Sequence, residues 1–138
     1  MFEVNYALIA AATVAQFVLG AIWYSPLMFG KWWMQIMECT SLSKEELKKM
    51  QKEMSPFYLL QLLLTFFTTV SLANLMPFVT GLSLYKLAFW IWFGFIVPVQ
   101  IASVVWANTK RKFWLKQIFV MISMQLAGLM MAAWILLR

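Results

Sequence analysis

The chain has 138 residues, of which 64% are hydrophobic and only 12% charged, and its mean hydropathy is +0.80. An ordinary soluble domain is about 45–50% apolar and about 25% charged, so this composition excludes a soluble globular protein. The net charge of +6 comes from basic residues between apolar runs, which indicates membrane topology rather than nucleic-acid binding.

Four long runs contain no charged residue: 4–24, 57–85, 87–109 and 117–137. A helix of about 20 apolar residues crosses the roughly 30 Å hydrocarbon core of a bilayer. The runs therefore predict an all-α fold, an integral membrane four-helix bundle that residues 1–138 form as a single domain. We expect the spans at about 4–24, 57–80, 84–108 and 115–137.

The first span is expected to end at Tyr24, because Ser25 precedes Pro26 and a residue before proline is disfavoured in the α conformation. The chain must turn there. Residues 27–37 are mostly apolar but too few to cross the membrane, and the residues after them are polar. We therefore predict that 27–55 form a cytoplasmic interfacial loop.

Within that loop the sequence predicts a short amphipathic helix over 43–54. Ser43 and Glu46 have the spacing of a capping box, and Leu47, Met50 and Met54 follow at helical spacing. Proline is tolerated in the first turn of a helix, so Pro56 is expected to open the second span.

The third span contains Pro98, whose ring clashes with the carbonyl of Gly94 four residues earlier and removes one backbone hydrogen bond. We therefore predict a kink at Gly94 and Pro98. Such kinks are common in membrane helices, so the kink indicates a gating hinge only weakly.

Basic residues are distributed unequally between the two sides of the membrane. With four spans the two termini share one side, and the loops after the first and third spans share the other. The first side carries Lys86 and Arg138, and the second carries Lys31, Lys44, Lys48, Lys49, Lys52, Lys110, Arg111, Lys112 and Lys116. The positive-inside rule places the second side in the cytoplasm and both termini outside.

Tryptophan residues support this orientation, because amphipathic rings prefer the membrane interface. Five of them fall near the predicted cytoplasmic boundary and are expected to anchor the bundle in the lipid bilayer: Trp23, Trp32, Trp33, Trp106 and Trp114.

Amides and hydroxyls are the polar groups inside the runs, and each span contributes a glutamine. Together with two groups at the first turn they predict a polar cavity open to the cytoplasm: Gln16, Tyr24, Ser25, Gln61, Thr65, Thr68, Gln100, Ser103 and Gln125. The spacing equally fits hydrogen bonds that hold the helices together. Four short helices also leave a large lipid-facing perimeter, which favours a homo-oligomer.

The sequence lacks the residues that several classes of chemistry require. The charge-free runs lack the ionisable groups that usually mark proton-coupled transport. There is no histidine, Cys39 is the sole cysteine, and no phosphate loop, metal-ligand spacing or nucleophile with its base occurs. We therefore expect no enzyme activity, no cofactor and no metal.

The run Gly20-Ala21-Ile22-Trp23-Tyr24-Ser25-Pro26, followed by Phe29-Gly30-Lys31 and Trp33-Met34, resembles a bacterial membrane family, domain of unknown function 1761. The similarity extends through Trp92-Phe93-Gly94-Phe95 to Pro98 and to Trp114-Leu115. The resemblance implies a small four-helix protein of the bacterial inner membrane, and it carries no catalytic residue with it.

Two functional hypotheses follow. In the first, the polar residues form a cytoplasm-facing cavity for a small solute or a lipid headgroup, as in a transporter or channel. In the second, the bundle is an anchor and the helix over 43–54 binds a protein partner.

Overall fold

The computed structural model describes residues 4–138, and residues 1–3 of the predicted domain lie outside this range. The described chain is helical, which confirms the all-α prediction. Its helices are α1 (Tyr6–Trp23), α2 (Gly30–Ile36), α3 (Lys44–Leu75), α4 (Leu84–Ile91), α5 (Val97–Trp106) and α6 (Trp114–Leu136), with short turns η1 (Met76–Phe78), η2 (Trp92–Ile96) and η3 (Arg111–Phe113).

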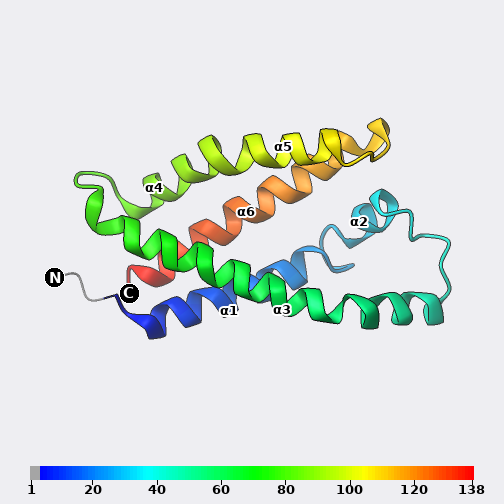
Figure 1. The fold of residues 1–138 in the computed structure, drawn as a ribbon, viewed down its shortest axis with the longest axis horizontal. Coiled ribbons are helices and arrows are strands. Elements are labelled where there is room, and N and C mark those ends of the chain that lie inside the picture. Colours follow the sequence, from blue (N-terminus) through cyan, green and yellow to red (C-terminus); the bar gives the residue numbers. More distant parts are fainter. Residues whose placement is uncertain (1–3) are drawn as a thin grey trace.

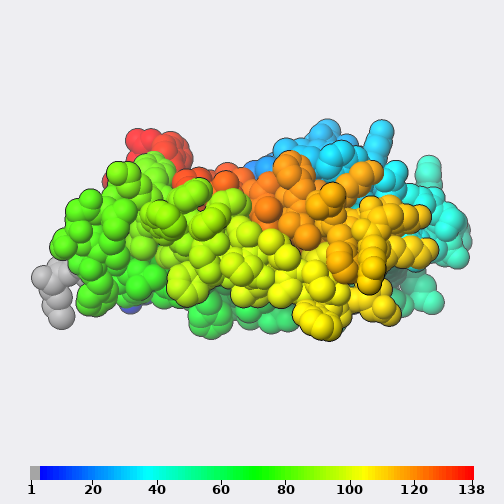
Figure 2. Space-filling view, turned by 90° about the horizontal axis from the view of Figure 1, so that it is seen from above, coloured from blue at the N-terminus to red at the C-terminus, as the bar shows by residue number. Residues whose placement is uncertain are grey.

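Four helical segments are long and apolar enough to cross a membrane: Tyr6–Trp23, Lys44–Phe78, Leu84–Trp106 and Arg111–Leu136. In Figure 1 the start of α1, the end of α6 and the connection from α3 to α4 lie at one end of an elongated molecule. The connections from α1 to α3 and from α5 to α6, which carry most of the basic residues, lie at the other end. Figure 2 shows the same separation along the long axis.

The helices pack in the order α3, α1, α6 and then α4 with α5. Helix α1 lies against both α3 and α6, while α4, η2 and α5 pack on α6. The buried core between them is made of small and aliphatic side chains: Ala12, Leu72, Leu84, Ala88, Leu129, Ala132 and Ala133. Alanines at these crossings let the backbones approach closely, as packing inside a bilayer requires.

Helix α3 differs from the prediction at Pro56. The capping box is confirmed, because the Glu46 carboxylate accepts from Ser43 N and Ser43 Oγ accepts from Glu46 N. However, no new helix begins at Pro56, and one helix of 32 residues runs through it. The carbonyl of Lys52, which Pro56 cannot bond, instead accepts a hydrogen bond from Ser55 Oγ at 2.8 Å. The predicted amphipathic helix is therefore the first part of α3, which continues without a break into the second span.

The third span has an irregular turn close to the predicted kink. Gly94 lies in a π-helical turn, η2, and the N–H of Val97 bonds to the carbonyl of Trp92, five residues earlier. This widened turn places Pro98 in the first turn of α5, where no N–H donor is needed. The irregular turn in the third span, at Trp92–Ile96, therefore precedes the proline.

Candidate functional site

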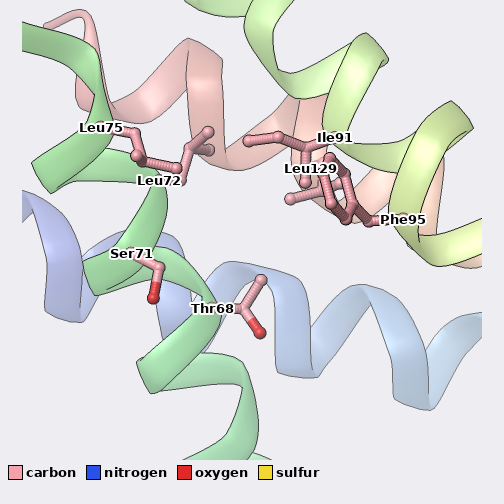
Figure 3. Close-up of a pocket in the computed structure, with 7 residues that line it drawn as sticks. All are labelled: Thr68, Ser71, Leu72, Leu75, Ile91, Phe95 and Leu129. Carbon is pink, nitrogen blue, oxygen red and sulfur yellow. The ribbon is translucent and has the colours of Figure 1, made fainter. Parts of the chain in front are cut away.

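A pocket of about 240 Å³ lies between α3 and the third span, with α6 at its base (Figure 3). Five of its lining side chains are apolar and two carry hydroxyls: Leu72, Leu75, Ile91, Phe95, Leu129, Thr68 and Ser71. Leu75 and Phe95 are also exposed, at 43% and 71%. Because these are outward-facing side chains of membrane-spanning helices, the pocket borders the lipid.

The pocket-lining side of α3 continues towards the basic end of the molecule as a polar stripe. Gln61, Thr65 and Thr68 precede Leu72 and Leu75 at spacings of three and four residues, so all five lie on one side of the helix. Thr65 Oγ1 donates to the carbonyl of Gln61 at 2.8 Å, and Gln61 Nε2 donates weakly to Thr65 Oγ1 at 3.4 Å. This side of α3 is thus polar at Gln61 and Thr65 and mainly apolar where it lines the pocket.

Gln125 belongs to the same region. It stands one helical turn before the pocket residue Leu129 on α6, on the same side of that helix and towards the basic end. Its side chain is half-buried. Of the residues predicted to form the polar cavity, Thr68 lines this pocket, Thr65 and Gln125 stand about one helical turn from lining residues, and Gln61 stands two turns before Thr68.

Gln16 has a different position. Its side chain is only 7% exposed, and its Nε2 donates to Thr69 Oγ1 at 2.7 Å and to the carbonyl of Ala12 at 3.1 Å. Its Oε1 lies 3.5 Å from where a Cβ on Gly128 would be. Gln16 therefore joins α1 to α3 and fills the space left by a glycine on α6, which is the packing role considered for the glutamines.

Gln100 and Ser103 form a local pair on α5. Ser103 Oγ donates to the carbonyl of Gln100 at 2.8 Å and lies 3.4 Å from its Oε1. Gln100 precedes the buried Val104 by one turn, so it lies on the side of α5 that packs on α6.

Tyr24 and Ser25 form a tight turn between α1 and α2. The carbonyl of Ser25 accepts from the N–H of Met28 at 3.1 Å and of Gly30 at 2.8 Å, and Ser25 Oγ donates to the carbonyl of Ile22. A Cβ on Gly30 would lie 2.4 Å from the carbonyl carbon of Ser25. The Ser25-Pro26 segment therefore requires glycine at position 30, and its polar groups are used in the turn.

The five predicted interface tryptophans all lie at the basic end. Trp106 is 86% exposed, and the ammonium of Lys116 lies 5.3 Å from the ring centre of Trp32. Trp33 packs edge-on against Tyr24. Two of the five donate to backbone: Trp114 Nε1 to the carbonyl of Thr109, and Trp23 Nε1 to the carbonyl of Val120 on α6. Trp23 thus also joins two spans.

Gln117 is a buried polar residue that the sequence analysis did not select. It is 7% exposed, and its Oε1 has no hydrogen-bond partner among residues 4–138. Its position directly after Lys116, at the start of the last charge-free run, made it resemble an ordinary boundary residue. Only the packing of α6 distinguishes it.

An ion pair joins the two loops at the basic end. The ammonium of Lys110 pairs with the carboxylate of Glu38, and both side chains are more than half exposed, at 61% and 58%. The hydrogen bond from Lys110 and then its charge, with a smaller effect of Lys112, lower the pKa of Glu38. The pair links the loop after α2 to the loop after α5.

The Glu38 pair should make a small pH-dependent contribution to stability. Because the pKa of Glu38 is lower in the folded protein, this stabilisation is present at neutral pH and is lost as the pH falls through the folded pKa. We expect Glu38→Gln to lower the Tm in detergent slightly at pH 7 and by less at acidic pH, where the carboxylate of the folded protein becomes protonated, and 1 M salt to reduce the difference. An equal effect of the substitution at both pH values would contradict this.

The four long apolar helices define the chain as a multi-pass membrane protein. The model of one family, described as Protein of unknown function (DUF1761), matches residues 7–137. The chain therefore belongs to this family, as its turn motif predicted. No curated protein and no solved structure matches the chain.

Proposed function

We propose that this protein binds an amphiphilic, lipid-like molecule at the pocket between α3 and the third span. The apolar part of the ligand occupies the pocket, and its polar group lies against the amides and hydroxyls of α3 and α6. The role is one of binding rather than catalysis. The observation that carries the proposal is the change along α3 from the apolar pocket wall at Leu72 and Leu75 to the polar stripe at Gln61 and Thr65.

Two features favour an amphiphile over a small polar solute. The pocket is lined mainly by Leu, Ile and Phe side chains, which offer a sugar or an ion no compensation for its lost hydration. Gln16, which a central polar path would need, is instead bonded to Thr69 in the packing between α1 and α3. A ligand with an apolar chain and one polar end matches this surface.

Photo-crosslinking tests the proposal. A diacylglycerol with a diazirine in one acyl chain, in phosphatidylcholine nanodiscs, should label the pocket segments 68–75 and 91–95 or Leu129. Leu75→Trp should fill the pocket and reduce this labelling several-fold. Leu63→Trp, a matched change at a 48% exposed position of α3 outside the pocket lining, should leave it unchanged. Labelling spread evenly over the lipid-facing residues, and equal in all three proteins, would contradict the proposal.

We further propose that the basic end faces the cytoplasm of a bacterial inner membrane, with the termini outside. In a Cys39→Ala background, a membrane-impermeant maleimide should label Leu82→Cys in intact cells and should not label Lys48→Cys until the membrane is opened. The reverse labelling pattern would show that the basic end faces outward and would contradict this topology. Leu82 is in the connection between α3 and α4, and Lys48 is in the first part of α3.

The exposed first part of α3 supports a second candidate role, that of an interaction subunit. Residues 44–56 are exposed at nearly every position, with Leu47 half-buried, and carry both charges and apolar groups. A stoichiometric protein partner that is lost on deletion of 44–54 would favour this second role. A homo-oligomer, with the same segment or the lipid-facing spans as its interface, stays a prediction that native mass spectrometry from mild detergent checks.

A further inference from the structure

Helix α2 and the start of α6 meet at the basic end of the molecule, where three aromatic rings form a common surface. Phe29, Trp32 and Phe119 contact one another, with ring centres 5.6, 5.8 and 6.4 Å apart. Trp32 and Phe119 are still 38% and 49% exposed. Figure 2 shows this part of α6 (orange) beside α2 (light blue) on the molecular surface. The rings therefore offer an apolar surface that no other helix covers.

Two lysines lie at the edge of these rings. The ammonium of Lys116 lies 5.3 Å from the ring centre of Trp32. Lys112 precedes Lys116 by four residues, about one helical turn, and Phe119 follows Lys116 by three. Both lysines are exposed. We call this surface the α2–α6 corner and define it by Phe29, Trp32, Lys112, Lys116 and Phe119.

The positive charge of the corner is not neutralised within the protein. Among residues 4–138 the one ion pair joins Lys110 to Glu38, at the margin of the corner. Segments 27–38 and 110–116 contain five basic residues and that one carboxylate. Residues 44–53 of α3, the other basic segment, contain four lysines and three glutamates. The excess positive charge is therefore concentrated beside α2 and the start of α6.

Charge and apolar surface follow one another in the order of a membrane interface. Phe119 lies three residues beyond Lys116 along α6, which is about 4.5 Å further into the span. Leu115, at 84% exposed, extends the apolar surface beside Lys116. A lysine at the end of a span covers apolar surface with its stem and holds its ammonium at the level of the headgroups. A phospholipid has the same order, with its phosphate above its acyl chains.

From this arrangement we infer that the α2–α6 corner binds an anionic phospholipid, such as phosphatidylglycerol, with the phosphate at Lys112 and Lys116 and an acyl chain along Trp32 and Phe119. This site is separate from the pocket of the proposed function. The excess of cations favours a headgroup with a net negative charge over phosphatidylcholine, whose choline carries a positive charge. An acidic protein segment could meet the lysines, but it has no chain to cover the rings that lie deeper in the membrane.

Competition against a lipid probe tests the inference. The protein is placed in phosphatidylcholine nanodiscs with a phosphatidylglycerol that carries a diazirine at the start of one acyl chain. Labelling should map to peptides that contain Trp32 or Leu115 to Phe119. Unlabelled phosphatidylglycerol should displace the probe at a mole fraction at least about fivefold lower than phosphatidylcholine of the same chains, the factor that one lysine supplies near an anionic surface. Equal displacement by the two lipids would overturn the inference.

Two pairs of substitutions connect this preference to the corner. Lys112→Gln combined with Lys116→Gln should bring the two lipids close to parity. Lys48→Gln combined with Lys49→Gln is the matched control, because it removes the same charge from the first part of α3 and should leave the preference unchanged. An equal loss in both double variants would show attraction by the overall charge and not by this site, and would overturn the inference.

Inorganic phosphate identifies the source of the bound group. It has the charge of the headgroup but no chain for Trp32 and Phe119, so it should not displace the probe. Displacement by inorganic phosphate would mean that the corner binds a free anion, and would also overturn the inference. None of these results alters the labelling expected at the pocket between α3 and the third span, which tests the proposed function by itself.

Discussion

Gly30→Ala is expected to be the most damaging of the five possible glycine-to-alanine substitutions in this protein. The new Cβ would lie 2.4 Å from the carbonyl carbon of Ser25, 2.5 Å from its oxygen and 2.9 Å from the carbonyl oxygen of Tyr24. All three are backbone atoms, so a rotamer change cannot relieve the overlap. The turn must open, which breaks the 2.8 Å hydrogen bond from Gly30 N to the Ser25 carbonyl.

The cost should exceed the usual penalty of overpacking, and we expect a loss of more than about 3 kcal/mol. Unfolding in mixed micelles with increasing sodium dodecyl sulfate measures it. Gly94→Ala is the control, because a Cβ there would meet nothing within 4 Å. Equal stability of the two variants would show that the turn at Ser25 does not have the geometry described.

Trp92→Ala is expected to have the second largest effect. Trp92 Nε1 donates to the carbonyl of Ile122 on α6 at 2.7 Å, and its ring packs against Phe89. The substitution removes both the hydrogen bond between the third and fourth spans and much of the packing beside it. We expect a loss of at least about 2 kcal/mol in the same unfolding measurement.

Trp92→Phe separates the two contributions, since it keeps most of the ring and removes the donor, and should cost about 1 kcal/mol. Trp90→Ala is the matched control. Its ring is 58% exposed on the lipid-facing surface, so we expect a change within about 0.5 kcal/mol. A Trp92→Phe variant as stable as the unmodified protein would mean that the bond to Ile122 contributes nothing.

The parts of the fold that depend on local sequence were predictable. Charge-free runs gave the four spans, because a charged residue within a bilayer is costly wherever the neighbouring helices lie. The Ser43 and Glu46 capping box was also predictable, because its two hydrogen bonds join residues only three positions apart in the sequence. The continuity of α3 was missed, although the compensating donor, Ser55, directly precedes Pro56.

The site was less predictable, because it depends on which helices become neighbours. The hydrogen bond of Gln16 to Thr69 joins residues 53 positions apart, and its existence follows from the rotation of α1 against α3. The pocket likewise needs Ile91 and Phe95 of the third span beside Leu72 and Leu75. Periodicity indicated that Gln61, Thr65 and Thr68 share a side of one helix, and it contained no information on what that side faces.

The unbroken course of α3 has a mechanical consequence. A helix of 32 residues is about 48 Å long, which is well beyond the thickness of the hydrocarbon core. Pro56 lies inside this helix, and Ser55 Oγ bonds the Lys52 carbonyl that Pro56 leaves without a backbone donor. Because α3 is continuous from Lys44 to Leu75, its charged first turns and the wall at Thr68 and Leu72 belong to one helix, and a tilt of that helix would shift both together.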